Sequence, residues 1–368
     1  MARRTVALIA AGALVVMLAV VTALIPVPYA ALVPGPATNV LGLQKDKPVI
    51  SISGRQTYPP EGEFTLVTVA VTGVDYRMDL LTALQGWLDP RVAIVPKQAV
   101  YPGNKPKKQL ERENAEQMRS SQQQAVIAAL RALDLARQTV LVDSVDTDAP
   151  AQRKLRANDT IVEVDGTSVT TAEQVRAAVT RHASGDAISF TILRDGKQQA
   201  VVVSTAGSPE KLEQARVGIA LRDEYTYPLE VDIQVDNIGG PSAGLLFALA
   251  IYDTLTPGNL TGGQNIAGTG TIDVNGNIGA VGGVQMKVIA AGQAGAEVFL
   301  TPKDNCADAL ATKPDGLRLV KVTTLQEALN TLEALRTGRG DLPQCSGEDG
   351  SSGSILREHL SQPRREAQ

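Results

Sequence analysis

The spacing of apolar and polar residues first predicts a mixed region over residues 47–137. Two β-branched runs bounded by Gly or Pro, residues 48–53 and 64–71, predict strands. Apolar residues at helical spacing predict a short helix over residues 80–88 and a longer one over 111–136. The longer helix is polar at its start and apolar in its second half.

A second period of strands and turns covers residues 138–206. Asp165-Gly166 and Asp195-Gly196 are tight-turn signals between apolar runs. Thr170 or Thr171 is placed to cap the start of an amphipathic helix. The predicted elements are a strand over 140–142, a helix over 171–180, and a hairpin of strands 187–193 and 199–203.

The third patterned region runs over residues 212–336, after a linker at 208–213. A strand over 231–235 is followed by a glycine turn and a helix over 243–252. Beyond it, residues 337–368 are rich in Gly, Ser and charge, a composition typical of disorder.

The N-terminus has one long apolar stretch. Residues 5–25 carry no charge, and about 20 apolar residues span a bilayer core. A signal peptide usually has a shorter apolar region, of roughly 7–15 residues, so we expect an uncleaved transmembrane anchor, with a cleaved signal as the alternative. Arg3 and Arg4, in a stub of residues 1–4, would remain in the cytoplasm. Residues 26–46, punctuated by Pro and Gly, are expected to be a tether. Everything after Pro26 is expected outside the cytoplasm, whether the segment is an anchor or a cleaved signal.

Composition narrows the chemistry. The hydrophobic fraction is 43% with 3% aromatics, which predicts cores of aliphatic residues. A net charge of −4 gives no electrostatic footprint for nucleic acid. Two cysteines and two widely separated histidines argue against a metal site. Cys306 and Cys345 would lie where a disulfide can form, and sequence leaves open whether they pair.

Ser242 is the candidate nucleophile. Pro241 suits a first helical turn, so Ser242 lies where free backbone N–H groups and the helix dipole favour negative charge. A simple helix cap is the structural alternative. Residues 240–244 also fit the G-x-S-x-G pattern of α/β-hydrolases, but the only downstream histidine is His359, in the expected disordered tail. A serine–histidine–acid triad is therefore excluded.

A serine without histidine needs another base, and lysine can replace it once burial lowers its pKa. Lys287 alone lies among apolar residues with no acid nearby in sequence. An exposed lysine on an amphipathic helix is the alternative reading. The other serine–lysine spacing, Ser208 to Lys211, lies in the linker and lacks the K-T-G partner of penicillin-binding proteins. The remaining downstream lysines lie in loop-like sequence or alternate in a strand: Lys303, Lys313 and Lys321.

These segments resemble the proteolytic domain of Lon proteases, peptidase family S16. The matching motifs are Gly240-Pro241-Ser242-Ala243-Gly244, Gly268-Thr269-Gly270, Gly276, Val281-Gly282-Gly283-x-x-x-Lys287-x-x-Ala290-Ala291, Ala294-Gly295-Ala296 and Pro302-Lys303-Asp304-Asn305. The resemblance implies Ser242 as nucleophile, Lys287 as general base and Thr269 as the residue that orients it, with Gly240 and Ala243 in supporting roles. Two acids usual in Lon are replaced, by Gly239 and by Thr271.

Residues 138–206 resemble a PDZ domain, through the phrase L-x-x-x-D-x-I-x-x-V-D-G, the following helix and the final hairpin. PDZ domains bind extended peptides at a sheet edge. Residues 133–137, before the first strand, contain no Gly-Leu-Gly-Phe-type carboxylate loop, so a spacer that binds no terminus is the alternative. The whole chain resembles the membrane-anchored Lon-like proteases with a PDZ domain that occur in actinobacteria.

The predicted fold class is α+β: a Lon-type proteolytic domain, a PDZ domain and an N-terminal β-containing region packed near the protease, preceded by one transmembrane helix. We expect a serine endopeptidase of exported or unfolded proteins, without cofactor, metal or nucleic acid. No G-x-x-x-x-G-K-[ST] phosphate loop occurs, so we expect no ATP requirement. The resemblance also implies ring-forming homo-oligomers such as hexamers. The alternative function is a catalytically silent PDZ scaffold that binds exported peptides.

Overall fold

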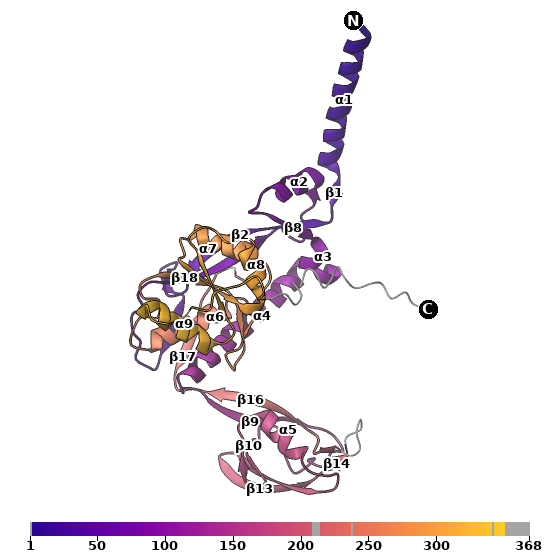
Figure 1. Ribbon diagram of the computed structural model, residues 1–368. Coiled ribbons are helices and arrows are strands. Elements are labelled where there is room, and N and C mark those ends of the chain that lie inside the picture. Colours follow the sequence, from indigo (N-terminus) through magenta and orange to yellow (C-terminus); the bar gives the residue numbers. More distant parts are fainter. Residues whose placement is uncertain (1, 208–213, 237, 341, 350–368) are drawn as a thin grey trace. The chain divides into compact units, whose positions relative to one another are not determined.

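The computed structural model describes residues 2–207, 214–236, 238–340 and 342–349 (Figure 1). They form two compact units. The first combines residues Met1–Ala132 with Leu229–Gln368, and the second is Leu133–Pro228. The second unit is therefore an insertion in the chain of the first. This division differs from the expected succession of separate domains along the sequence.

The core of the first unit is a six-stranded sheet with strand order β22-β21-β18-β6-β2-β8. Neighbours β6, β18, β21 and β22 run parallel, whereas β2 is antiparallel to both β6 and β8. The sheet strands are β2 (Tyr29–Asn39), β6 (Glu63–Val71), β8 (Ala93–Pro96), β18 (Asn265–Gly268), β21 (Val298–Pro302) and β22 (Arg318–Val322). β21 is buried along its whole length, as expected for a parallel strand with both faces covered.

Helices α6 and α7 cover opposite faces of this sheet. Val284 and Val288 of α7 belong to the same buried cluster as Ala267 of β18. Successive strand residues point to opposite faces, and a Cβ on the next residue, Gly268, would lie 3.2 Å from Leu246 of α6. The helices of the unit are α1 (Ala2–Leu24), α2 (Leu80–Leu88), α3 (Lys97–Val100), η1 (Pro102–Asn104), α4 (Lys107–Ala132), α6 (Gly244–Leu255), α7 (Val284–Gln293), η2 (Lys303–Asn305), α8 (Cys306–Leu310) and α9 (Leu325–Thr337).

The expectation of a tether over residues 26–46 is wrong, because much of this segment is β2, an inner strand of the sheet. The prolines that suggested a tether lie where a strand tolerates them: the register between β2 and β6 shifts between Pro34 and Ala37. The short strands of the unit are β1 (Pro26–Val27), β3 (Leu43–Gln44), β4 (Lys47–Pro48), β5 (Ile50–Ser53), β7 (Met78–Asp79), β17 (Glu230–Ile233), β19 (Thr271–Ile272) and β20 (Ile278–Gly279).

The second unit is built on a sheet of order β13-β12-β10-β9-β16, with the short strand β11 paired to β10. Its core is aliphatic around Phe190, and helix α5 contributes Val175 and Val179 to it. The elements are β9 (Arg137–Val145), β10 (Thr160–Val164), β11 (Thr167–Ser168), α5 (Ala172–Val179), β12 (Ala187–Arg194), β13 (Lys197–Ser204), β14 (Ala206–Gly207), β15 (Ala215–Arg216) and β16 (Ile219–Thr226).

Strand β16 moves a predicted boundary. It was expected to fall in the third region, over residues 212–336, but it pairs antiparallel with β9 and so belongs to the sheet of the second unit. The pairing places Ile219 opposite Val145 and Thr226 opposite Arg137. Because β9 is the first strand and β16 the last, the two connections to the first unit leave from neighbouring strands.

The N-terminal helix α1 runs over Ala2–Leu24 and leads into β1 (Figure 1). Over the part of the chain that the structure describes, no helix has both the length and the apolar character needed to cross a membrane.

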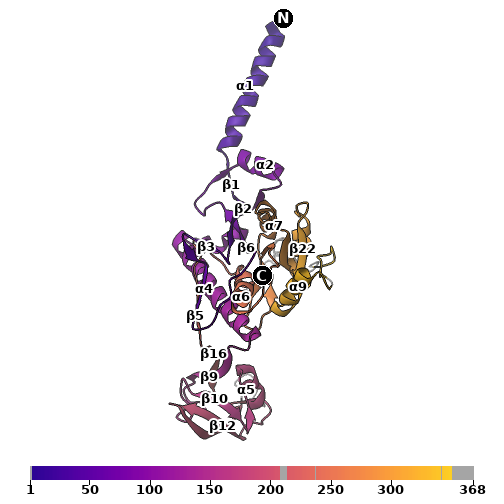
Figure 2. The same ribbon diagram turned by 90° about the vertical axis from the view of Figure 1, so that its left-hand side faces the viewer.

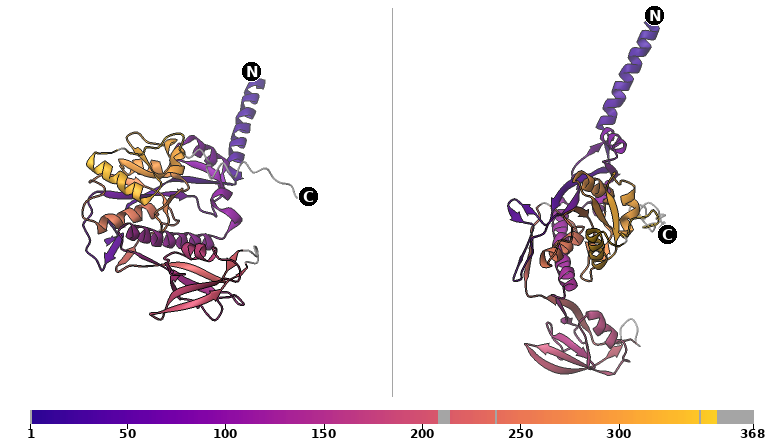
Figure 3. Two further views of the ribbon diagram at one scale, coloured as in Figure 1. Left: turned by 60° about the horizontal axis from the view of Figure 1, so that its bottom comes forward. Right: turned by 60° about the vertical axis from the view of Figure 1, so that its left-hand side comes forward.

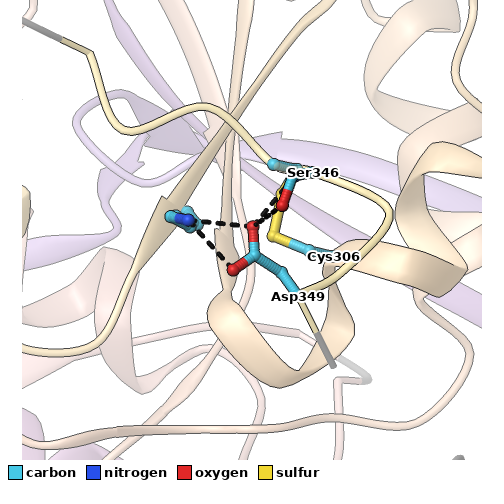
Figure 4. The surroundings of a disulfide bond; sticks show 5 residues. Cys306, Ser346 and Asp349 are labelled. Atoms are coloured by element: carbon cyan, nitrogen blue, oxygen red, sulfur yellow. Dashed lines mark hydrogen bonds and ion pairs between the residues drawn. A yellow bond between two sulfur atoms is a disulfide. The ribbon is translucent and has the colours of Figure 1, made fainter. Parts of the chain in front are cut away.

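The segment after α9 is attached to the first unit, although disorder was expected over residues 337–368. Cys345 forms a disulfide with Cys306 of α8. Lys321 of β22 pairs with Asp349 at 2.8 Å, and Ser346 Oγ donates to the same carboxylate (Figure 4). These partners hold the pKa of Asp349 well below its usual range. The rest of the expected tail, residues 350–368, lies outside the described residues.

Candidate active site

Ser242 lies in the turn between β17 and α6. The helix begins at Gly244, with Ala243 as its N-terminal cap residue and no side-chain capping bond. Ser242 therefore does not cap the helix, which removes the structural alternative for this residue. Gly240 has φ +87°, a left-handed conformation that favours glycine, and this bend leads the chain into the Ser242 turn.

The side chains of Ser242 and Lys287 meet although they are 45 positions apart: Lys287 Nζ lies 2.7 Å from Ser242 Oγ. Lys287 is in the first turn of α7, whose N-terminal cap Gly283 has φ +67°. Lys287 is 4% exposed, which excludes the alternative of an exposed lysine on an amphipathic helix. Burial disfavours the ammonium form and lowers the pKa of Lys287 to about 7. A substantial neutral fraction of this amine exists at neutral pH.

Thr269 completes a three-residue network. Lys287 Nζ donates to Thr269 Oγ1 at 2.9 Å, and the Thr269 hydroxyl donates to the carbonyl oxygen of Ser242 at 3.1 Å. Thr269 is fully buried, directly after β18, and its backbone N–H donates to the Leu300 carbonyl. With one N–H of a neutral Lys287 directed to Thr269, the lone pair of Nζ is available to accept from Ser242 Oγ–H.

Helix α4, which sequence reasoning did not connect with the site, contacts the Ser242 turn at two points. Ser121 Oγ donates to the Pro241 carbonyl at 2.9 Å, and the Asn114 carbonyl accepts from Gly240 N–H at 3.2 Å. Ser121 is 3% exposed. The only signal for Ser121 in the sequence is that a polar residue lies on the apolar side of the amphipathic helix α4. The long helix α4 and the shorter α6 lie side by side in two different views (Figures 2 and 3).

The same helix explains one departure from the Lon pattern. A Cβ built on Gly239 would lie 2.9 Å from Asn114 Cβ, so any side chain there requires α4 to shift. The position that usually carries an acid in Lon is thus closed by close packing. Of the two supporting residues, Gly240 already donates its amide to Asn114, and Ala243 is buried at the start of α6.

Asn305 fixes the loop that leads into α7. Its Oδ1 accepts from Val281 N–H at 2.8 Å and its Nδ2 donates to the Val281 carbonyl at 3.0 Å. Asn305 is 5% exposed and immediately precedes Cys306, the α8 partner of the disulfide. The loop before α7, the helix that carries Lys287, is therefore fixed by two hydrogen bonds from a residue next to the disulfide. Among the described residues, no three His, Cys, Asp or Glu side chains gather in a way that could hold a metal ion.

The structure therefore places a serine hydroxyl next to a buried lysine amine. Residues 233–335, which contain Ser242, Thr269 and Lys287, match the family model described as the Lon protease (S16) C-terminal proteolytic domain. Residues 117–205 match the PDZ domain model, a range that includes the second half of α4. The first unit thus contains a proteolytic domain of the Lon serine-peptidase family, and the chain also contains a PDZ domain.

Curated relatives agree with this assignment over the proteolytic domain. Lon protease 2 of Bacillus subtilis is 33% identical over 117 residues, covering 30% of this chain and 21% of that protein. Lon protease of Clostridioides difficile is 48% identical over 69 residues, covering 19% and 8%. The archaeal Lon protease of Methanocaldococcus jannaschii is 29% identical over 142 residues, covering 38% and 21%. The chain therefore spans about a fifth or less of the length of these relatives.

Among solved structures, the PDZ domain of the SdrC-like protein of Listeria monocytogenes is 25% identical and covers 22% of this chain and 85% of that one, with a TM-score of 0.21. A protein of Geobacillus thermodenitrificans is 32% identical and covers 22% and 94%, also with a TM-score of 0.21.

Proposed function

We propose that this protein is a serine endopeptidase in which Ser242 is the nucleophile and Lys287 the general base. The observation that carries the proposal is the 2.7 Å distance between the Nζ of a buried lysine, whose pKa burial lowers to about 7, and a serine hydroxyl. Neutral Lys287 takes the Ser242 proton as Oγ attacks the carbonyl carbon of the scissile peptide bond. The resulting ammonium returns that proton to the departing amine, which leaves an acyl-enzyme.

In the second half of the reaction, water attacks the ester carbonyl and Lys287 accepts a proton from it. Collapse of the tetrahedral intermediate breaks the bond to Ser242 Oγ, which takes the proton back from Lys287. Both intermediates carry a negative oxygen. The backbone amide of Ala243, the N-terminal cap residue of α6, is the proposed donor, because unpaired N–H groups at a helix N-terminus and the helix dipole stabilise negative charge. The next two amides, of Gly244 and Leu245, already donate to the carbonyls of Pro241 and Gly270.

Thr269 is the proposed positioning residue for the base. It holds one N–H of Lys287 and at the same time contacts the Ser242 carbonyl, so it fixes the amine relative to the nucleophile. In this arrangement the lone pair of neutral Nζ can point toward Ser242 Oγ. This is the role that a third residue plays when it orients the base of a nucleophilic serine.

The test is hydrolysis of casein, an unstructured protein, by the full chain. We use the full chain because β2 begins at Tyr29, so a shortened protein that starts within residues 29–39 would lose part of the central sheet. Ser242→Ala and Lys287→Ala should each abolish turnover while leaving the fold intact, as circular dichroism measures. Lys313→Ala, at an exposed lysine, is the control and should retain full activity. Cleavage at the control rate in either site variant would overturn the dyad, and inactivity of the unaltered chain would favour the scaffold function.

We further propose that peptide hydrolysis needs no ATP and acts on peptides or unfolded segments. The printed sequence holds no P-loop motif, so nothing in it supplies a phosphate cradle. Casein cleavage should therefore proceed at the same rate with and without ATP and Mg²⁺. A rate that depends on added nucleotide would overturn this part of the proposal.

Export and membrane attachment are also proposed. The uncharged run over residues 5–25, the exposed apolar side chains of α1 and the Cys306–Cys345 disulfide support them. The expected location is the cell membrane, with residues 1–4 cytoplasmic and the catalytic unit outside. In intact cells stripped of their wall, added protease should degrade the catalytic unit. Full protection of that unit would show that it faces the cytoplasm.

Two partners complete the proposal. The proposed peptide site is strand β16, at the edge of the second unit's sheet. Asp223 of β16 accepts a hydrogen bond from Ala172 N–H at the start of α5, so this strand edge lies beside a helix. An extended peptide can add to such an edge. We also propose homo-oligomers such as hexamers. Titration with unstructured peptides and sedimentation of the purified chain test these two points.

A further inference from the structure

The exposed apolar side chains of this protein are concentrated in two stretches. Nearly all large hydrophobic residues that are exposed in the described chain lie in residues 6–25 or 76–88; the exceptions are Leu43, Leu193 and Val202. Scattered exposed hydrophobics are normal, but a contiguous group marks a binding surface. The first stretch is α1 and its end. The second is centred on helix α2 (Leu80–Leu88), which has no part in the proposed active site.

Helix α2 buries small residues and exposes large apolar ones, the reverse of the usual pattern in a water-soluble domain. Its small residues, Ala83 and Gly86, face inward, and a Cβ on Gly86 would lie 2.6 Å from Ile94 of β8. Four of its large apolar residues face outward, whereas Leu80 is partly buried. The outward apolar side chains and their exposed fractions are Leu81 45%, Leu84 42%, Trp87 53% and Leu88 86%. No charge interrupts this face, because the acidic residues lie just beyond the helix ends, at Asp79 and Asp89.

The chain places α2 directly beside the end of α1. Strand β1, which follows α1, pairs with β7, which precedes α2, so that Val27 lies opposite Met78. The N–H of Leu80, the first residue of α2, donates to the carbonyl of Ile25 at 3.1 Å. Figures 1 and 2 both show α2 next to the lower end of α1. The two exposed apolar stretches therefore form one continuous surface.

We propose that the outward face of α2, formed by Leu81, Leu84, Trp87 and Leu88, lies in the headgroup region of a lipid bilayer. This inference rests on the proposed membrane attachment of the chain. Short apolar faces bury about 5–10 Å into the boundary between headgroups and acyl chains. Tryptophan and tyrosine favour that boundary, and Trp87 stacks edge-on against Tyr29 with ring centroids 5.8 Å apart. The surface continues that of α1, which would share the same lipid environment.

Trp87 is the only tryptophan in the sequence, so intrinsic fluorescence reports on this face alone. The full chain is reconstituted into vesicles of phosphatidylcholine and phosphatidylglycerol whose acyl chains carry bromine near the headgroup or near the methyl end. The expected result is a blue-shifted Trp87 emission and stronger quenching by the shallow bromine than by the deep one. Vesicle flotation measures attachment of the chain separately, and casein hydrolysis measures the peptidase.

Each outcome decides one point. A chain that floats with its vesicles but shows unquenched Trp87 overturns the α2 proposal and leaves attachment intact. A chain that does not float overturns both, without affecting the peptidase. A blue shift that appears without vesicles as protein concentration rises shows that a second copy of the chain covers this face, which also overturns the proposal.

Two matched substitutions sharpen the result. Leu88→Glu places a charge on the most exposed side chain of the α2 face and should strongly reduce quenching. Leu43→Glu, at a leucine that is 69% exposed in another part of the unit, should leave quenching unchanged. Both positions are exposed, so both variants should fold. Equal quenching in the two variants would mean that α2 does not enter the lipid.

Discussion

Ser121 of α4 donates a 2.9 Å hydrogen bond to the carbonyl oxygen of Pro241, the residue immediately before Ser242. The bond links the turn that carries Ser242 to a helix outside the range that matches the Lon proteolytic domain, residues 233–335. Ser121 also packs closely against the start of α6: a Cβ added to Gly244 would lie 3.0 Å from Ser121 Oγ. The start of α6 and the Ser242 turn are therefore shaped by α4 as well as by their own sequence.

Replacing Ser121 with Ala should lower the turnover number by about tenfold or more, with little change in KM. The Pro241 carbonyl would keep only the long hydrogen bond from Gly244 N–H, at 3.5 Å, and small misplacements at a reaction centre reduce rate strongly. Steady-state casein or peptide hydrolysis measures this. Ser120→Ala, at the neighbouring exposed serine, is the matched control and should behave like the unaltered protein. Equal activity of the two variants would show that α4 does not position Ser242.

The pH dependence of activity should follow the ionisation of Lys287. Burial lowers its pKa to about 7, and only the neutral amine can accept the Ser242 proton. The rate constant kcat/KM should therefore rise as pH increases through about 7 and then level off. Lys287→Arg should be inactive at every pH, because a guanidinium does not deprotonate in this range. A profile that stays flat from pH 5 to 9, or that falls, would contradict a lysine base.

The same group should make stability depend on pH. Its pKa is about 7 in the folded state and 10.5 as an ordinary lysine, so the unfolded chain binds more protons between these values. The contribution of Lys287 to the free energy of unfolding should therefore be least favourable below about pH 7 and should become more favourable from there toward pH 10. In Lys287→Met this increase should be absent. Urea unfolding of both proteins at pH 6 and pH 9 measures how much the free energy of unfolding changes with pH in each. The same change in both proteins would show that Lys287 is not desolvated.

Much of the active site could be predicted from local sequence signals. Ser242 stood out by its glycine-flanked turn and Lys287 by its apolar neighbours, and the structure brings both side chains together with Thr269. These residues lie next to ends of regular elements, where sequence signals are strong. Their distance could not be obtained from spacing, since it depends on α6 and α7 packing on opposite faces of one sheet.

The domain organisation was much harder to predict, for a physical reason. Residues 26–46 contain many Pro and Gly residues, yet β2 pairs on both sides because a register shift accommodates its prolines. The contacts of Ser121 and Asn114 join residues more than a hundred positions apart across the inserted PDZ unit. The spacing of apolar and polar residues within a short stretch of sequence cannot predict contacts between residues so far apart. Strand β16 was assigned to the wrong unit for the same reason, since its partner is β9.

Thr269→Val should reduce turnover by about 10–100-fold while preserving the fold. Valine fills the same volume but removes both the acceptor for Lys287 and the donor to the Ser242 carbonyl, a loss of about 1–3 kcal/mol. Thr269→Ser keeps the hydroxyl and should retain most of the activity. The two variants are compared by kcat at a pH above 7, where the amine is neutral. Full activity of the valine variant would limit Thr269 to a packing role.

Reduction of the Cys306–Cys345 disulfide should lower the free energy of unfolding by roughly 2–4 kcal/mol, because the bond closes a long loop, with 39 positions between its ends. Activity in the folded state should change little, since the two hydrogen bonds between Asn305 and Val281 do not involve sulfur. Urea unfolding with and without dithiothreitol measures the first effect and peptide hydrolysis the second. Lys321→Ala, which removes the ion pair with Asp349 but keeps the hydrogen bonds from Ser346 to that carboxylate, should lower the free energy of unfolding by less than reduction does. An unfolding curve that dithiothreitol leaves unchanged would mean that the two thiols are not paired in the protein, while a large loss of activity on reduction would mean that the disulfide supports the base through Asn305.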